Sequence, residues 1–267
     1  MKLSIITVNL NNKDGLQKTI DSVISQTFKD FEWIVIDGGS TDGSKELIEH
    51  YSDYISYWIS EPDKGVYNAM NKGIRIAKGE YVEFLNSGDI FYDKNSLLDF
   101  FSKAEEKDIL FGSTIIHKNG KYTRINLQND YLSCYHLTKE TINHQSAFIK
   151  KKLFIEHGLY DESLKIVSDW KFFFEMLVIN KCTLYYKDQD IIIYDTNGVS
   201  SINVEKRKQE RLYVLKQYLP EFAIDDYLSR FEINELLNHL WTRQLIRLLY
   251  RITIWLEKKH FINRNIC

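Results

Sequence analysis

The sequence predicts an α/β protein with a mostly parallel sheet, because short apolar segments alternate with segments of helical periodicity. Strands are expected where β-branched and other apolar residues cluster, at residues 3–8, 31–36, 54–59 and 81–85. Leu16, Ile20 and Val23 recur at helical spacing, and further helices are expected at residues 44–50 and 66–77. This alternation is typical of right-handed crossovers that cover both faces of a parallel sheet.

The middle of the chain is more mixed and gives way to a helical region. Strands at residues 109–117 and 122–125 flank a turn that contains Asn119 and Gly120, which indicates a hairpin. Later strands are expected at residues 146–149, 184–186 and 191–194, and helices at 151–157 and 168–179. We therefore expect an α/β domain over residues 1–200 and a C-terminal helical region over residues 201–267.

Composition places the chain among ordinary soluble globular proteins. Of its 267 residues, 44% are hydrophobic and 27% charged, which excludes a disordered or collagen-like chain. A net charge of −2 does not indicate nucleic acid as a partner. Cys134, Cys182 and Cys267 form no metal or disulfide pattern, which favours a reducing, cytoplasmic location. No apolar run is long enough for a transmembrane span, and no signal peptide is expected.

Acidic segments that contain glycine follow three of the predicted strands, at residues 37–43, 61–65 and 86–89. Because the carboxyl ends of parallel strands meet at one edge of a sheet, we expect these segments to lie together, where such folds bind ligands.

Asp37 and Asp63 are candidates for nucleoside binding. The Asp37 carboxylate is followed by Gly38 and Gly39, which let a nucleobase or ribose approach the backbone. Asp63 lies in a loop that Pro62 stiffens, and can also hold a ribose or base. Lys64 and the amides that begin the next helix can face phosphate. Each segment is also consistent with an ordinary capped turn, and both interpretations stay open.

Two further carboxylates are candidates for metal binding and catalysis. Asp89 closes the segment Asn86-Ser87-Gly88-Asp89 and can take one coordination position on Mg²⁺ or Mn²⁺, with diphosphate oxygens and water at the others. The alternative for this segment is a plain type I turn. Asp169 begins a predicted helix, as an N-cap or as a general base.

His144 and Trp170 are weaker candidates. A lone histidine before a strand is more often structural than functional, so a role for His144 is the less favoured interpretation. Trp170 can pack in the core or offer its face to a sugar ring.

The order and spacing of these segments resemble the family 2 glycosyltransferases, which have a GT-A fold. The matching motifs are SIITVN (residues 4–9), SQTF (25–28), FEWIVIDGGSTDG (31–43), EPDKG (61–65), NAMNKG (68–73), FLNSGD (84–89) and SD (168–169). The resemblance covers about residues 1–200, which makes that part the catalytic domain, and leaves the C-terminal helical region as an extension.

The resemblance implies inverting transfer of a hexosyl or N-acetylhexosaminyl group from a nucleotide-sugar, often a UDP-sugar, with Mn²⁺ or Mg²⁺ as cofactor. In the family, the acids at the positions of Asp37 and Asp63 line the nucleoside pocket. The last acid of the metal motif matches Asp89, and the base of a single displacement matches Asp169.

The chain departs from the family pattern in two places. Gly88 stands where many relatives carry an acid that contacts the ribose, which leaves Asp89 as the single side-chain metal ligand. Ser87 is a further candidate for donor binding. Asn68 stands where relatives often have Asp, and is a candidate donor-site residue.

The C-terminal region contains an apolar helical stripe between residues 233 and 256, with Arg243, Arg247 and Arg251 beside it. A basic amphipathic helix can lie on an anionic membrane surface. That placement, on the inner face of the cell membrane, suits a lipid-linked acceptor in bacterial polysaccharide assembly. The alternatives are packing on the chain's own domain or in a dimer, so the oligomeric state stays open.

Two other functions compete with glycosyl transfer to a glycan or lipid-linked acceptor. A sugar nucleotidyltransferase would show a longer Gly-rich N-terminal loop containing Arg or Lys, which this sequence lacks. A noncatalytic nucleotide-sugar-binding subunit is consistent with the reduced metal motif, but the presence of both Asp89 and Asp169 favours an enzyme.

Overall fold

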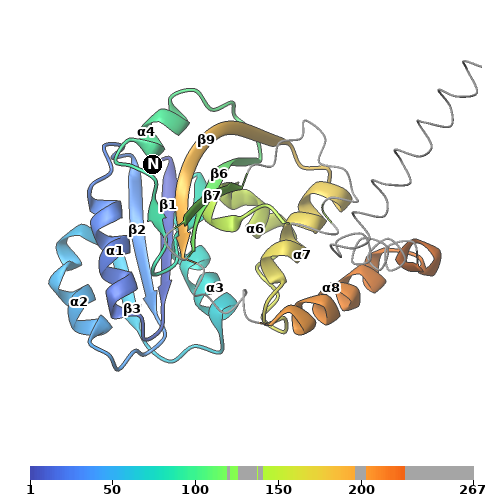
Figure 1. The fold of residues 1–267 in the computed structure, drawn as a ribbon, viewed down its shortest axis with the longest axis horizontal. Coiled ribbons are helices and arrows are strands. Elements are labelled where there is room, and N and C mark those ends of the chain that lie inside the picture. The colour runs from blue at the N-terminus through green and yellow to red at the C-terminus, as the bar shows by residue number, and fades with distance from the viewer. Residues whose placement is uncertain (119–120, 126–136, 138–140, 196–202, 226–267) are drawn as a thin grey trace, which may run out of the picture. The chain divides into compact units, whose positions relative to one another are not determined.

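A computed structural model describes residues 1–118, 121–125, 137, 141–195 and 203–225. In these residues the strands form one nine-stranded sheet in the order β3-β2-β1-β4-β8-β6-β9-β5, with β7 paired to β6 (Figure 1). The predicted α/β class is confirmed.

The N-terminal half of the sheet is parallel. Its strands are β1 (Leu3–Asn9), β2 (Phe31–Asp37), β3 (Tyr57–Ser60) and β4 (Tyr81–Phe84). The helices between them are α1 (Lys13–Ile24), α2 (Ser44–His50) and α3 (Val66–Ile76). A 3-10 turn at Ser52–Tyr54 delays the start of the third strand relative to the prediction, because pairing with β2 begins only at Tyr57.

The second half of the sheet is mixed. Its strands are β5 (Ile90–Phe91), β6 (Ile109–Lys118), β7 (Lys121–Ile125), β8 (Ala147–Lys150) and β9 (Leu184–Asp195). The helices are α4 (Ser96–Phe101), α6 (Lys151–His157), α7 (Ser168–Phe174), which continues as a π-helical turn to Ile179, and α8 (Val204–Tyr218). β8 runs antiparallel to β4 and β6, whereas β9 runs parallel to β6. The expected hairpin is present as β6 and β7.

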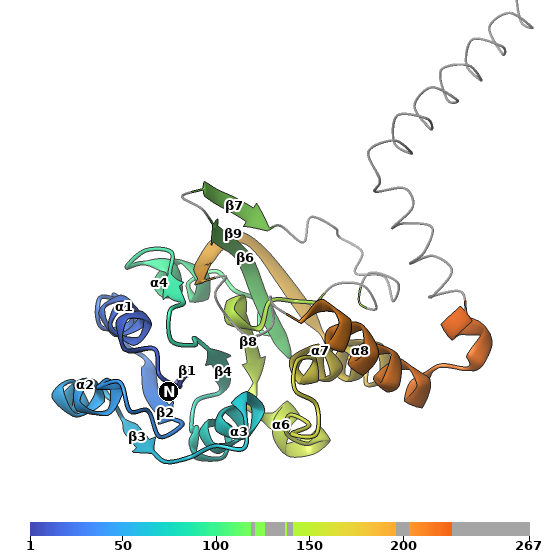
Figure 2. The ribbon, with the colours of Figure 1, turned by 60° about the horizontal axis from the view of Figure 1, so that its bottom comes forward.

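Helices cover both faces of the sheet, as Figure 2 shows for α1 and α4 on one face and α3 and α6 on the other. Successive side chains of a strand point to opposite faces, so Ile5 packs with Leu16 of α1 while Ile6 packs with Met70 of α3. Full burial of such a side chain contributes about 1.5–3 kcal/mol. This packing fixes the strands whose ends carry the acidic segments.

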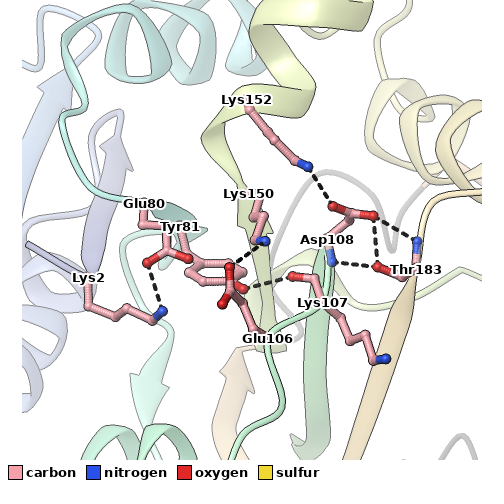
Figure 3. Close-up of polar contacts among 9 residues, drawn as sticks. All are labelled: Lys2, Glu80, Tyr81, Glu106, Lys107, Asp108, Lys150, Lys152 and Thr183. Carbon is pink, nitrogen blue, oxygen red and sulfur yellow. Dashed lines mark hydrogen bonds and ion pairs between the residues drawn. The ribbon is translucent and has the colours of Figure 1, made fainter.

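The edge of the sheet at which β1 and β4 begin is a network of charges, which we call the basal edge. Its residues are Lys2, Glu80, Tyr81, Glu106, Lys107, Asp108, Lys150, Lys152 and Thr183 (Figure 3). Tyr81 lies in the middle: its hydroxyl donates to the Lys107 carbonyl at 2.7 Å. The ammonium groups of Lys2 and Lys150 lie 4.9 and 5.9 Å from its ring centroid.

Lysines pair with the acids of the basal edge. The pairs are Lys2–Glu80 at 2.7 Å, Lys150–Glu106 at 3.1 Å and Lys152–Asp108 at 3.0 Å. Asp108 also accepts hydrogen bonds from the Thr183 amide at 3.0 Å and hydroxyl at 2.7 Å. Burial opposes ionisation of Asp108, but these donors and the Lys152 charge outweigh it and lower its pKa to about 2.

The chain divides into two compact units, Met1–Arg211 and Leu212–Cys267. The predicted boundary at residue 200 and the apolar stripe at residues 233–256 both lie outside the described residues. Among the helices that are described, none combines the length and apolar character needed to cross a membrane.

Candidate active site

Asp37 ends β2, and its side chain is completely buried. The sheet register places Asn9 and Ser60 on either side of it. Asn9 Nδ2 donates to Asp37 at 2.7 Å, Ser60 Oγ at 2.6 Å, and the amide and hydroxyl of Ser40 at 2.9 and 2.5 Å. Burial raises the pKa of Asp37, but these hydrogen bonds outweigh burial and hold the pKa below its ordinary value.

Asp37 therefore organises the loop that follows it. Gly39 has φ +80°, and a Cβ there would lie 3.2 Å from the Pro62 nitrogen. Glycine is favoured because a side chain would strain this backbone conformation and would lie tightly against the next acidic segment. Direct contact of Asp37 with a nucleoside stays a prediction.

Asp63 is half of an ion pair. Its Oδ1 accepts from Lys72 Nζ at 2.5 Å, and Lys72 also pairs with Glu61 at 2.7 Å. Burial opposes the charge of Lys72, but the two carboxylates raise its pKa. Asp63 Oδ2 lies 3.2 Å from the position of a Cβ at Gly38, so Asp63 borders the loop after Asp37.

Asn68 ties α3 to the segment before α7. Its Nδ2 donates to Glu162 at 2.8 Å, and Asn71 donates to the other Glu162 oxygen at 2.9 Å. Hydrogen bonds from Asn71 and Asn68 lower the pKa of Glu162. The Lys64 amide donates to Asn68 Oδ1 at 3.3 Å, and Lys64 is exposed. Donor contacts of Asn68 and Lys64 stay predictions.

The segment after β4 is anchored by α1 and its N-cap. Asn12 Nδ2 donates to the Ser87 carbonyl at 3.0 Å. Thr19 Oγ1 accepts from the Gly88 amide at 3.0 Å and donates to the Asp89 carbonyl at 2.8 Å. Gly88 has φ +103°, a conformation that favours glycine over residues with a side chain. Asp89 itself is 3% exposed.

Glu83 is a buried acid that the sequence patterns did not single out. It lies on β4 with no exposed surface, and neither of its oxygens has a hydrogen-bond partner in the described part of the chain. Burial first, and then the negative charge of Asp89, raise its pKa well above the ordinary value. The charged form of the Glu83 carboxyl is therefore disfavoured.

Asp169, on the first turn of α7, is held by a hydrogen-bond partner at each of its two oxygens. Its Oδ1 lies 2.8 Å from the Tyr67 hydroxyl, and its Oδ2 lies 2.8 Å from His144 Nδ1. Burial raises the pKa of Asp169, but the hydrogen bond from His144 leads the opposing contacts, and the pKa is lowered. The carboxylate is therefore ionised at neutral pH.

His144 connects this carboxylate to the loop of Asp89. Its Nε2 lies 3.3 Å from Asn86 Nδ2, which can only donate. His144 Nδ1, on the other side of the ring, lies within hydrogen-bond distance of Asp169 Oδ2. A single imidazole thus links the candidate base to the loop of the candidate metal ligand.

Trp170 packs in the core and offers no face to a sugar. Its side chain is among the largest that are fully buried, and its Nε1 donates to the Leu137 carbonyl at 2.6 Å. Its ring stacks on Phe174 with centroids 5.7 Å apart. The core interpretation is the one that this packing favours.

The four acids Asp37, Asp63, Asp89 and Asp169, which we call the acidic edge, are connected by contacts. Asp63 borders the loop of Asp37, as described above. The Ser87 amide donates to the end of β1 at 3.1 Å, next to the strand position that binds Asp37. His144 then links the same loop to Asp169. Segments far apart in sequence therefore meet at one edge.

The segment 86–89 fits a divalent ion that arrives with a diphosphate. In the residues described, no group of three or more His, Cys, Asp or Glu side chains is arranged to hold a metal. Asp89 offers a carboxylate, and the Asn86 Oδ1 is buried with no partner among the described residues. Oxygen ligands of this kind suit Mg²⁺ or Mn²⁺ when water and phosphate oxygens complete the shell.

Comparison with known families and structures shows the family to which the chain belongs. The model of glycosyl transferase family 2 matches residues 4–160. The chain belongs to glycosyl transferase family 2. Among relatives, the PGL/p-HBAD biosynthesis glycosyltransferase of Mycobacterium tuberculosis is 28% identical over 218 residues, which cover 78% of this chain and 83% of that protein.

Solved structures confirm the GT-A fold of this family 2 member. S. aureus TarS 1–349 in complex with UDP-GlcNAc has a TM-score of 0.66 at 18% identity, covering 86% of this chain and 71% of that one. This chain spans 44% of a longer TarS structure. The mannosyltransferase PcManGT of Pyrobaculum calidifontis, in complex with GDP-Man and Mn²⁺, has a TM-score of 0.61 at 12% identity, covering 95% and 80%.

Several residues of the site were not predicted from the sequence. They are Asn9, Tyr67, Lys72, Glu83 and Glu162. Lys72, with Asn68 and Asn71, lies in the NAMNKG segment that resembles the family. Polar residues at helical spacing, directly after an acidic loop, are a signal that could have pointed toward Asn71 and Lys72.

Proposed function

We propose that this family 2 member transfers a sugar, hexosyl or N-acetylhexosaminyl, from a nucleotide-sugar to a hydroxyl of a glycan or lipid-linked acceptor, with inversion. The observation that carries the proposal is the contact series Asp169–His144–Asn86, which joins a buried, ionised carboxylate to the loop of Asp89. TarS in complex with UDP-GlcNAc and PcManGT in complex with GDP-Man and Mn²⁺ support a nucleotide-sugar donor. The family resemblance favours a UDP-sugar.

Asp169 is the base in this mechanism. The acceptor oxygen attacks the anomeric carbon, the bond from that carbon to the diphosphate breaks, and its electron pair leaves with the diphosphate. The acceptor proton passes to Asp169, whose lowered pKa keeps it ionised and ready to accept. Tyr67 and His144 hold the carboxylate in one orientation, which is the positioning that an attacking hydroxyl requires.

The remaining residues of the acidic edge bind the donor. Asp89 would hold Mn²⁺ or Mg²⁺, with Ser87 and Asn86 beside it. When bound, the ion supplies Lewis-acid stabilisation of the diphosphate. Asp63 and the loop organised by Asp37 form the wall for the nucleoside, while Lys64 and Asn68 lie on the next turn toward the phosphates.

A noncatalytic nucleotide-sugar-binding subunit is the second candidate. The observation that favours it is Gly88, whose backbone conformation disfavours the acid that relatives carry. The ionised Asp169 argues for the enzyme, because a buried carboxylate with oriented donors has no evident use in a module that only binds the donor.

The proposed place of action is the cytoplasmic face of a membrane, reached through the apolar stripe at residues 233–256 and the arginines beside it. The sequence pattern alone supports this part of the proposal. Co-sedimentation of the full chain with anionic vesicles, compared with neutral ones, tests it, and equal recovery in the supernatant with both would contradict it.

The test of the function is a transfer assay with the full chain. A panel of nucleotide-sugars is incubated with a glycan or lipid-linked acceptor and Mn²⁺, and the anomeric configuration of the product is read by NMR. We expect one nucleotide class to react, with inversion. If the chain binds nucleotide-sugars of one class but neither transfers nor hydrolyses any of them, the noncatalytic candidate is supported instead.

A further inference from the structure

Glu210 of α8 binds the backbone just before the candidate base. Its Oε1 lies 2.9 Å from the Lys165 amide nitrogen, and its Oε2 lies 2.9 and 3.3 Å from those of Ile166 and Val167. Successive amides that converge on one carboxylate make charge-assisted hydrogen bonds, which are stronger than those to a neutral acceptor. Glu210 belongs to the same compact unit as the rest of the site.

The segment that Glu210 binds leads directly into Asp169. Val167 stands at the N-cap position of α7, where its apolar side chain makes no capping hydrogen bond. The free amides at the start of a helix need an acceptor, and a negative charge there is favourable. Glu210 supplies both to the Val167 amide from another helix, and it also binds the two amides that precede Val167.

The same segment is also held from its other side. The Tyr67 hydroxyl lies 2.7 Å from the Ile166 carbonyl and 2.8 Å from Asp169 Oδ1. On the far side of Asp169, the Arg211 guanidinium lies 5.0 Å from the centroid of the Trp170 ring. Residues of α8 therefore contact the chain both before and after Asp169.

We propose that Glu210 is a positioning residue, which sets the orientation of the Asp169 carboxylate by binding the amides of residues 165–167. The inference rests on the proposed function and deepens it, because it makes α8 part of the machinery that transfers the acceptor proton. Glu210 touches neither donor nor acceptor. Small displacements of a base can cost about 10²-fold in rate.

The test is Glu210→Ala in the full chain, with steady-state kinetics and donor binding measured separately. We expect kcat for transfer to fall about 10- to 100-fold. The KM for the donor and the donor-induced rise in Tm should stay within about twofold, because the nucleoside wall and the Asp89 loop are untouched. Glu205→Ala is the matched control, since Glu205 is exposed on the same helix and contacts Gln209 at 3.4 Å.

Glu210→Gln keeps the volume and removes one acceptor oxygen, so it should fold even where the alanine variant does not, and lose an intermediate part of kcat. An unchanged kcat in both variants overturns the inference. So does a loss of kcat and donor binding in parallel, or an equal loss in Glu205→Ala. Full transfer by Asp169→Asn would instead overturn the assignment of the base, whatever Glu210→Ala does.

Discussion

The two edges of the sheet hold their carboxylates in opposite ways. At the basal edge, lysines lie against Glu80, Glu106 and Asp108 (Figure 3). At the acidic edge, Asp37 and Asp169 are held by asparagine, serine, tyrosine and histidine donors. The lysines of the basal edge cancel the negative charge of the acids with which they pair, whereas uncharged asparagine, serine and tyrosine donors stabilise a carboxylate and leave its negative charge in place. That charge is available to a cation or to a proton in transfer.

Asp63 differs from Asp37 and Asp169 because a lysine pairs with it. It lies at the acidic edge and pairs with Lys72, which also binds Glu61. A lysine shared between two acids leaves a net negative charge, so the region stays acidic even where a cation is present. The comparison predicts that variants of Asp169 and His144 change turnover, whereas variants of Asp37 and of the basal edge change mainly stability.

The largest expected effect is that of Asp169→Asn. A general base contributes about 10²- to 10⁴-fold, and we expect kcat for transfer to fall by that amount while donor binding is retained. Asp161→Asn is the control. It also removes an acid that contacts α7, because Asp161 pairs with Lys171 of that helix at 2.7 Å. Equal turnover in both variants would remove Asp169 from the mechanism.

The next effect is that of His144→Ala, which removes the donor that leads in lowering the pKa of Asp169. We expect kcat to fall about 10- to 100-fold because the carboxylate is less well oriented. The pKa of Asp169 should rise, so the acid limb of the pH–kcat profile should move to higher pH. His157→Ala, at an exposed histidine of α6, should leave the profile in place. An acid limb that does not move in His144→Ala contradicts the proposed contact.

Asp37→Asn is expected to act on stability more than on chemistry. An amide cannot accept every hydrogen bond that Asn9, Ser40 and Ser60 donate, and the loss should be about 1–3 kcal/mol in unfolding free energy at pH 7. Because the folded pKa of Asp37 is lowered, its contribution is present above pH of about 4 and lost as pH falls through the folded value. Urea unfolding at pH 7 and pH 3 measures the difference in unfolding free energy between the variant and the wild type. This difference should become smaller at pH 3, and a larger difference at pH 3 would contradict the prediction.

The smallest effect is expected at the basal edge. Asp108→Asn should cost about 1–2 kcal/mol at pH 7, a value reduced for solvent screening of a side chain near the surface. The wild-type contribution is present above pH of about 4 and is lost as pH falls through the folded pKa of about 2. Turnover at 25 °C should equal that of the wild type; a loss of kcat larger than threefold would show that the two edges are not separate in function.

The parallel half of the fold and the acidic edge could be predicted because both depend on local patterns. Apolar runs of strand length and residues at helical spacing fixed the order of β1 to β4, and the acidic segments follow directly from strand ends. The sequence pattern predicts the start of β3 three residues early, because residues 54–56 have a strand-like composition. In the structure, Tyr54 is still the last residue of a 3-10 turn, and β3 begins at Tyr57. Pairing with β2, which no local pattern reports, decides that boundary.

The partners of the acids could not be predicted, because each lies far away in sequence. Tyr67 and Asp169 are 102 residues apart, and Glu210 and Ile166 are 44 apart. Glu83 gave no signal either, since one acid in an apolar strand is consistent with an edge position as well as with burial. His144 shows the same limit: its role depends on Asn86 and Asp169, which only the folded chain brings to its two nitrogens.

The most direct test of the central claim, that the acidic edge binds an activated sugar through a metal, is a thermal-shift titration of nucleotide-sugars with and without Mn²⁺. A ligand that binds the native state raises Tm by mass action. We predict that one nucleotide-sugar class raises Tm equally in the wild type and in Asp108→Asn. The Mn²⁺-dependent part of that rise should vanish in Asp89→Ala. An equal Mn²⁺-dependent rise in Asp89→Ala, or no rise with any nucleotide-sugar in the wild type, would contradict the account.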